Sequence, residues 1–118
     1  MASTFVAGDD LVFQVESGFG LLRVLAVEGE GAEAVWHVLV YEDFYPEVEA
    51  AEAALAGGGE LPARIPHLAL TAHAFEKTPV ARLGNRPLSE DESEPLRRWR
   101  DSGGEVFDRS VLLMLGMR

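Results

Sequence analysis

The chain has 118 residues, of which 47% are hydrophobic, and a formal net charge of −10 at pH 7. This length and composition predict a single globular domain over residues 1–118 and argue against wholesale disorder. The acidic excess disfavours binding to nucleic acid or to an anionic membrane, because both require Lys and Arg to neutralise phosphate. Because the chain contains no cysteine, disulfides, thiolate zinc sites and cysteine nucleophiles are excluded.

The sequence also indicates where the protein resides. No apolar run approaches the roughly 18 to 20 residues that span a bilayer. A signal peptide begins with a basic residue ahead of an apolar segment, and the stretch Met1–Phe5 does not show this pattern. Together with the absence of cysteine, these features predict a cytoplasmic protein without membrane association.

Residues 9–45 contain three apolar runs of strand length, which are separated by glycine turns at Gly18 and at Gly29–Gly31. Such runs predict an antiparallel β-meander. The second run is apolar on both faces, which predicts the central strand. One of its faces carries Leu21, Leu25 and Val27 together with Arg23, and the other carries Leu22, Val24 and Ala26.

Two further segments extend this sheet and begin to cover it. Residues 47–56 are rich in Ala and Glu and predict a helix that ends at Gly57–Gly59. Residues 63–70 predict a fourth strand at a sheet edge, since prolines flank its first half. Thr71 predicts the N-cap of a short helical turn, and residues 79–83 predict a brief fifth strand.

A further helix is predicted near residue 95, where two caps compete. Ser89 and Glu92 have capping-box spacing, but Pro95 would then lie inside the helix without an amide to donate. We therefore expect Ser93 as the cap and a helix over residues 93–101. The prediction is an α+β fold: an antiparallel SH3-like β-barrel or twisted sheet with three short helices.

The C-terminal segment, residues 105–118, is apolar enough to require a packing partner. Residues 105–107 predict a short strand, and Asp108 or Ser110 predicts the cap of a helix over residues 111–115. Two alternatives follow. The segment packs on the protein's own core, or it forms a homodimer interface.

The third strand supplies the candidate binding residues. Alternate residues of a strand share a face, so His37, Tyr41, Asp43 and Tyr45 are predicted to line one groove. We add the neighbouring Glu47 and Glu49 as candidate binding residues. A histidine beside a carboxylate is the minimum for general acid–base catalysis. However, no G-x-S-x-G nucleophile elbow is present, so no catalytic residue is assigned.

No metal or cofactor is predicted. The three histidines, His37, His67 and His73, lack a recognised ligand spacing. The glycines of 18–20 and 57–59 lack the spacing of a phosphate loop or a dinucleotide fingerprint.

The acidic residues are unevenly distributed along the chain. Between Val24 and Ala63 there is no Lys or Arg. This pattern predicts either a solvated face that keeps the protein soluble or an acidic surface for a basic protein partner. The nine acids of this run are Glu28, Glu30, Glu33, Glu42, Asp43, Glu47, Glu49, Glu52 and Glu60.

The first part of the chain resembles small bacterial immunity-type proteins of polymorphic toxin systems. The resemblance rests on Gly8–Phe13 (GDDLVF), the turn Gly18–Gly20 and the strand Leu21–Leu25 (LLRVL). The stretch His67–Phe75, followed by Pro87–Ser89, looks like uncharacterised bacterial proteins. The resemblance implies a β-rich barrel that binds and neutralises a toxin, and it assigns no functional residue.

Together these observations predict a non-enzymatic bacterial protein-binding module with an acidic interaction surface. The alternative is a small-molecule-binding protein or minor enzyme that uses the strand face of His37, Tyr41 and Asp43.

Overall fold

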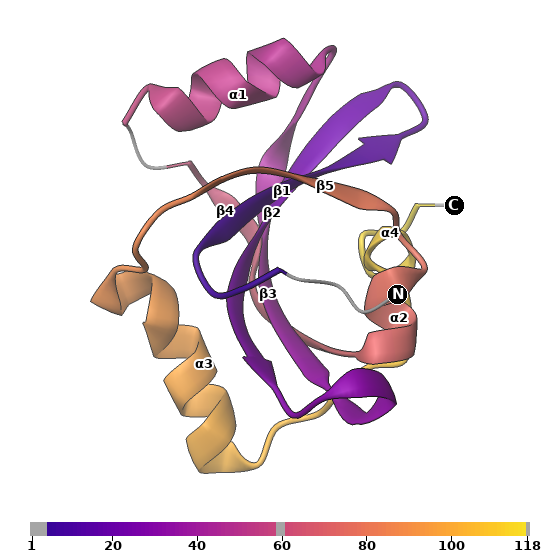
Figure 1. The fold of residues 1–118 in the computed structure, drawn as a ribbon, viewed down its shortest axis with the longest axis vertical. Helices are drawn as coiled ribbons and strands as arrows, with labels where there is room; N and C mark the ends of the chain where they lie inside the picture. The colour runs from indigo at the N-terminus through magenta and orange to yellow at the C-terminus, as the bar shows by residue number, and fades with distance from the viewer. Residues whose placement is uncertain (1–4, 59–60, 118) are drawn as a thin grey trace.

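The computed structural model describes residues 5–58 and 61–117 and shows an α+β fold (Figure 1). Gly59 of the predicted glycine stop, Glu60 of the acidic run and Arg118 of the C-terminal segment lie outside the described residues. The strands are β1 (Asp9–Val15), β2 (Gly18–Glu28), β3 (Val35–Tyr45), β4 (Ala63–Thr71) and β5 (Val80–Asn85). The helices are a 3-10 turn, η1 (Gly31–Glu33), and α1 (Val48–Ala56), α2 (Ala72–Glu76), α3 (Glu90–Ser102) and α4 (Val111–Met114).

The five strands form one antiparallel sheet in the order β4-β3-β2-β1-β5. β2 occupies the centre, as its two apolar faces predicted, and β4 occupies an edge. Because β5 pairs with β1 and not with β4, the described strands form an open sheet. Of the two predicted alternatives the protein therefore has the sheet, and the SH3-like barrel closure is not observed.

One face of the sheet packs against α2 and α4 and forms an apolar core, called here the α2/α4 face. Phe75 of α2 stacks on Trp36 of β3, with ring centroids 4.1 Å apart. Val111 of α4 is fully buried in the same cluster. The sheet residues of this face are Leu11, Phe13, Val15, Leu22, Val24, Trp36, Val38, Val40, Leu68 and Leu70.

The opposite face packs against α1 and α3 and is called here the α1/α3 face (Figure 1). α1 contributes Ala51, and α3 contributes Leu96 and Trp99. The buried sheet residues of this cluster are Val12, Leu21, Leu25, Leu39 and Tyr41. Both faces of the sheet are therefore covered, each by a pair of helices.

The predicted alternation of β2 holds up to a bulge and then reverses. The pairing of β2 with β3 shifts register between Val24 and Ala26. An extra residue in one strand exchanges the faces of the residues that follow it. As a result Val27 packs on the α2/α4 face and Ala26 on the α1/α3 face, contrary to the prediction.

The prediction of a helix over 93–101 was wrong at its start. α3 begins at Glu90 and is capped by Ser89, whose hydroxyl accepts a hydrogen bond from the amide of Glu92. The Glu92 carboxylate accepts in turn from the amide of Ser89, which completes the capping box. Pro95 lies inside the helix, where the lost bond involves only the carbonyl of Asp91 in an exposed turn. The reciprocal cap outweighs that loss.

The C-terminal predictions are confirmed in part. Ser110 caps α4, with its hydroxyl accepting from the amide of Leu113. The predicted strand at 105–107 is reduced to a single parallel bridge between Phe107 and Leu70. In the part of the chain that the structure describes, no helix is long and apolar enough to cross a membrane.

Candidate functional site

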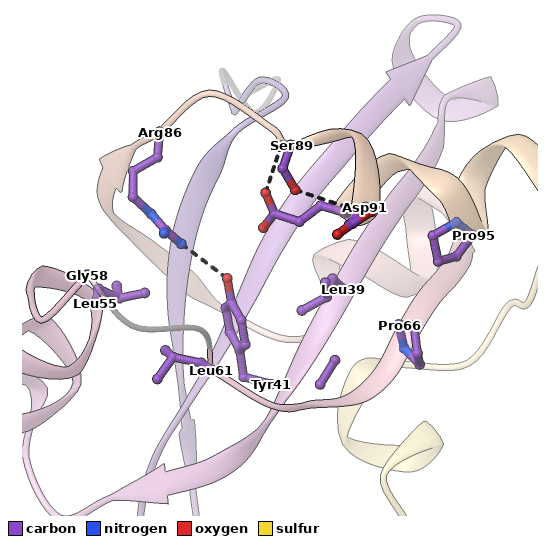
Figure 2. A pocket seen from close by; sticks show the side chains of 12 residues that line it. Leu39, Tyr41, Leu55, Gly58, Leu61, Pro66, Arg86, Ser89, Asp91 and Pro95 are labelled. Atoms are coloured by element: carbon purple, nitrogen blue, oxygen red, sulfur yellow. Dashed lines mark hydrogen bonds between the residues drawn. The ribbon is translucent and has the colours of Figure 1, made fainter.

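A cavity of about 400 Å³ opens on the α1/α3 face, between the end of α1, the start of α3 and strands β3 and β4 (Figure 2). Apolar side chains form most of its wall, and polar groups gather on the side of α3. It is lined by Leu39, Tyr41, Leu55, Gly58, Leu61, Ala63, Pro66, Arg86, Ser89, Asp91, Glu92 and Pro95.

Arg86 and Tyr41 meet at this cavity (Figure 2). Arg86 donates to both carboxylate oxygens of Asp10, through Nε at 2.7 Å and Nη2 at 3.0 Å. Nη2 also donates to the Tyr41 hydroxyl at 3.2 Å. The bidentate pair with Asp10 fixes the plane of the guanidinium. These hydrogen bonds, together with the charge of Asp10, raise the pKa of Arg86.

Arg23 shares Asp10 with Arg86 and is only 1% exposed. Its Nη groups donate to the carbonyls of Gly8, Arg86 and Pro87, each at 3.0 Å. Its Nε lies 2.8 Å from Glu92, and Nη1 lies 3.3 Å from Asp10. A buried guanidinium is tolerated only when paired in this way. Arg23 thereby ties the start of α3 to the centre of the sheet.

The ionisation states follow from these contacts. Burial raises the pKa of Tyr41, and the nearby Asp10 raises it further, so the phenol keeps its proton. Burial opposes ionisation of Glu92. The hydrogen bond from the backbone amide of Ser89 and the charge of Arg23 outweigh burial and lower the pKa of Glu92. The network therefore contains two guanidinium cations, Arg23 and Arg86, against two carboxylates, Asp10 and Glu92.

A second polar cluster lies under the other end of α3. His37 is fully buried, and its Nε2 lies 2.8 Å from Oε1 of Glu28. Its Nδ1 lies 2.9 Å from Nε2 of His67. Trp99 of α3 contacts the His37 ring edge-to-face, with centroids 4.8 Å apart. Arg100 holds the other Glu28 oxygen at 2.8 Å.

Both histidines of this cluster are neutral at pH 7. Burial lowers the pKa of His37. Burial, together with repulsion between the two rings when both carry a proton, lowers the pKa of His67 to about 4. The hydrogen bond to His37 is the largest contribution lowering the pKa of Glu28. The consistent arrangement has His67 Nε2–H donating to His37, and His37 Nε2–H donating to the Glu28 carboxylate.

The structure separates the side chains predicted to line one groove. Tyr41 borders the cavity, but His37 is enclosed beneath α3 and does not line it. Tyr45 packs against the α1/α3 cluster. Asp43 is exposed, as are Glu47 and Glu49 beside α1. The shared strand face was predicted for His37, Tyr41, Asp43 and Tyr45, but their surroundings in the structure differ: enclosed beneath α3, at the cavity, in solvent and against the α1/α3 cluster, respectively.

Five exposed acids lie within residues 42–52, along the end of β3 and the start of α1. All five are solvent-exposed, and none forms an ion pair within the described residues. We call this group the acidic surface. It consists of Glu42, Asp43, Glu47, Glu49 and Glu52.

Sequence reasoning missed the network of Arg23, Asp10, Arg86 and Glu92. The available signal was Arg23 itself, since a charged side chain in the strand predicted to be central requires buried partners. Asp10 lies opposite Arg23 in the pairing of β1 with β2, but nothing in the spacing identified Arg86 and Glu92, which lie 63 and 69 positions from Arg23. His67 was likewise considered only as a metal ligand and not as the partner of His37.

Among the described residues, no group of three or more His, Cys, Asp or Glu side chains is arranged to hold a metal ion. The comparisons add no relative. No protein-family model matches the chain, and neither the curated proteins nor the solved structures contain a match.

Proposed function

We propose that the chain is a non-enzymatic protein-binding module whose acidic surface engages a basic protein partner. The observation that carries this proposal is the density of exposed, unpaired acids in residues 42–52, a segment that contains no Lys or Arg. The five carboxylates of the acidic surface have no cationic partner within the described residues. In α3, by comparison, Arg97, Arg98 and Arg100 each contact a carboxylate of the same chain.

Unpaired carboxylates that lie close together in residues 42–52 create a local negative potential that attracts basic surfaces. They also lose no intramolecular ion pair when a partner binds. The resemblance to immunity-type proteins also supports a protein partner, because it implies that the partner is a toxin protein. Binding through such a surface weakens as salt screens the charges.

The alternative of a small-molecule site or minor enzyme on a His37, Tyr41 and Asp43 groove has less support. The three side chains occupy different environments, and both ring nitrogens of His37 already have partners. A general acid or base must reach the group whose proton it transfers. The buried His37 has no such access in this arrangement.

The test compares two variants of equal net charge. The first carries Glu47→Gln, Glu49→Gln and Glu52→Gln in the acidic surface. The control carries Glu30→Gln, Glu33→Gln and Glu105→Gln, which are also exposed and free of ion pairs among the described residues. Binding of a lysine-rich peptide is measured by fluorescence anisotropy at increasing NaCl concentration.

We expect the first variant to bind about tenfold more weakly than the wild type, since a few tenths to one kcal/mol is lost per exposed charge. The control should change little, and its binding should keep the salt dependence of the wild type. Equal weakening in both variants would mean that net charge alone attracts the peptide, and the acidic surface would lose its assignment.

A further inference from the structure

The cavity beside Tyr41 has the dimensions of a small-molecule site. Its volume of about 400 Å³ lies within the range of roughly 300 to 1,000 Å³ that is typical of such sites. Leu39, Leu55 and Leu61 supply apolar wall from three separate segments, and prolines of β4 and α3 complete it. Such a cavity accommodates the apolar body of a small ligand.

Two hydrogen-bond donors converge on one side of this cavity (Figure 2). Tyr41 is 5% exposed, and its hydroxyl accepts from Arg86 but has no acceptor for its own proton among the described residues. Asp10 accepts from Nε and Nη2 of Arg86. Nη1 of Arg86 has no acceptor among the described residues. Two adjacent donors of this kind recognise a single oxygen acceptor.

The charges around the cavity select against an anion. Asp10 compensates the guanidinium of Arg86, and Glu92 compensates that of Arg23. Asp91 then adds a further carboxylate to the lining. A ligand carboxylate would meet this surplus negative charge in a partly desolvated space, where like charges repel strongly.

We infer that the cavity binds a small uncharged molecule with an apolar body and one carbonyl-type oxygen. The oxygen accepts from the Tyr41 hydroxyl and from Nη1 of Arg86. The apolar body lies against Leu39, Leu55 and Leu61. This site is separate from the acidic surface, and neither proposal requires the other.

The test uses two probes that differ in charge but have the same ring system, 2-naphthamide and 2-naphthoate. Binding is followed by NMR through the methyl signals of Leu39, Leu55 and Leu61. We expect 2-naphthamide to shift these signals in a saturable way and 2-naphthoate to bind at least about tenfold more weakly. Absence of saturable shifts with 2-naphthamide, or tighter binding of 2-naphthoate, would overturn the inference.

Matched variants locate the site. Ala63→Phe fills the cavity and should abolish binding of 2-naphthamide, whereas Ala53→Phe, on the exposed side of α1, should leave it unchanged. Tyr41→Phe removes only the hydroxyl and should weaken 2-naphthamide about fivefold while leaving naphthalene unaffected. If Ala63→Phe fails to fold, Leu55→Trp serves as the filling variant. Retained 2-naphthamide binding in a folded filling variant would place the site elsewhere and refute the assignment.

Discussion

The two faces of the sheet are built on different principles. The α2/α4 face is closed by apolar packing, with Trp36 stacked on Phe75 and Val111 of α4 fully buried. The α1/α3 face encloses Arg23, Asp10 and His37 and retains an open cavity beside Tyr41. Apolar contacts are non-directional, whereas buried charges require specific partners.

This difference shows where each face obtains its specificity. On the α2/α4 face, any side chains of suitable size and shape fill the space. On the α1/α3 face, α3 is positioned by polar contacts at both ends, namely Glu92 to Arg23 and Arg100 to Glu28. The cavity is a consequence of that arrangement, because α1 and α3 are held over different parts of the same sheet face.

The largest expected effect comes from removing the centre of the charged network. Asp10→Ala leaves Arg23 buried without its nearest strand partner and releases Arg86. We expect the free energy of unfolding to fall by about 3 to 5 kcal/mol, as for other buried ion pairs that lose one member. Urea denaturation measures the change, and Asp43→Ala, which removes an exposed acid, should change it by less than about 0.5 kcal/mol. Similar small losses in both variants would mean that the charged network contributes little to the free energy of unfolding.

The histidine cluster predicts a pH dependence that the apolar face cannot produce. The folded-state pKa values of His37 and His67 are lowered from 6.5, that of His67 to about 4. Between pH 6.5 and about pH 4 the unfolded chain binds more protons than the folded one. The free energy of unfolding therefore falls as the pH is lowered through this range. The expected loss between pH 7 and pH 4.5 is on the order of 2 kcal/mol.

Urea denaturation at several pH values tests this dependence. His67→Gln should flatten the fall in stability between pH 6.5 and pH 4.5, whereas His73→Gln, at an exposed position, should leave it intact. Glu28 contributes stability that is lost only below its ordinary pKa of 4.5, so this window isolates the histidines. An unchanged slope in His67→Gln would contradict the assignment.

The position of the α3 cap gives a smaller effect with a clear control. Ser89→Ala removes the hydroxyl that accepts from Glu92 and should cost about 1 kcal/mol of stability. Ser93→Ala lies within the helix and should cost almost nothing. The two variants are compared by thermal unfolding and circular dichroism. A larger loss of stability in Ser93→Ala would instead support Ser93 as the cap of a shorter helix.

The smallest effect is expected at the outer side of α4. Val111 and Leu115 are buried in the protein's own core, while Leu113 is 57% exposed. Val106 is the other exposed large hydrophobic residue among the described residues of the C-terminal segment, and two such side chains fall far short of the roughly 1,000 Å² that a stable interface buries. We therefore expect a monomer by size-exclusion chromatography with light scattering, and no change of mass or stability in Leu113→Glu. A dimeric mass that Leu113→Glu reduces would instead assign residues 105–118 to a homodimer interface.

The sequence predicted most of the elements because their signals are local. Thr71 and Ser110 cap α2 and α4 through bonds to amides three residues ahead, and Pro46 follows the last residue of β3. The same reasoning failed at α3, where two local signals competed. The capping box of Ser89 outweighed the cost of Pro95, and local patterns do not rank such opposing terms.

The candidate site was predictable only in part. Alternation along β3 placed His37, Tyr41 and Tyr45 on one face, because side-chain direction in a strand depends on the backbone alone. It did not indicate that α3 would enclose His37 and leave Tyr41 at a cavity. That division depends on partners 30 to 76 positions away in the sequence, such as His67 for His37 and Arg86 for Asp10.

The amino-acid sequence by itself determined the α+β class, the central position of the second strand and the helix over residues 47–56. It also determined the uneven distribution of charge. These properties follow from periodicity, composition and capping over short stretches of chain. Only the tertiary structure decided that the sheet stays open, that Arg23 meets Asp10 and Glu92, and that the predicted groove divides into a buried histidine pair and a cavity. Those outcomes depend on which distant segments share a buried space, and burial is what makes charge pairing and hydrogen bonding selective.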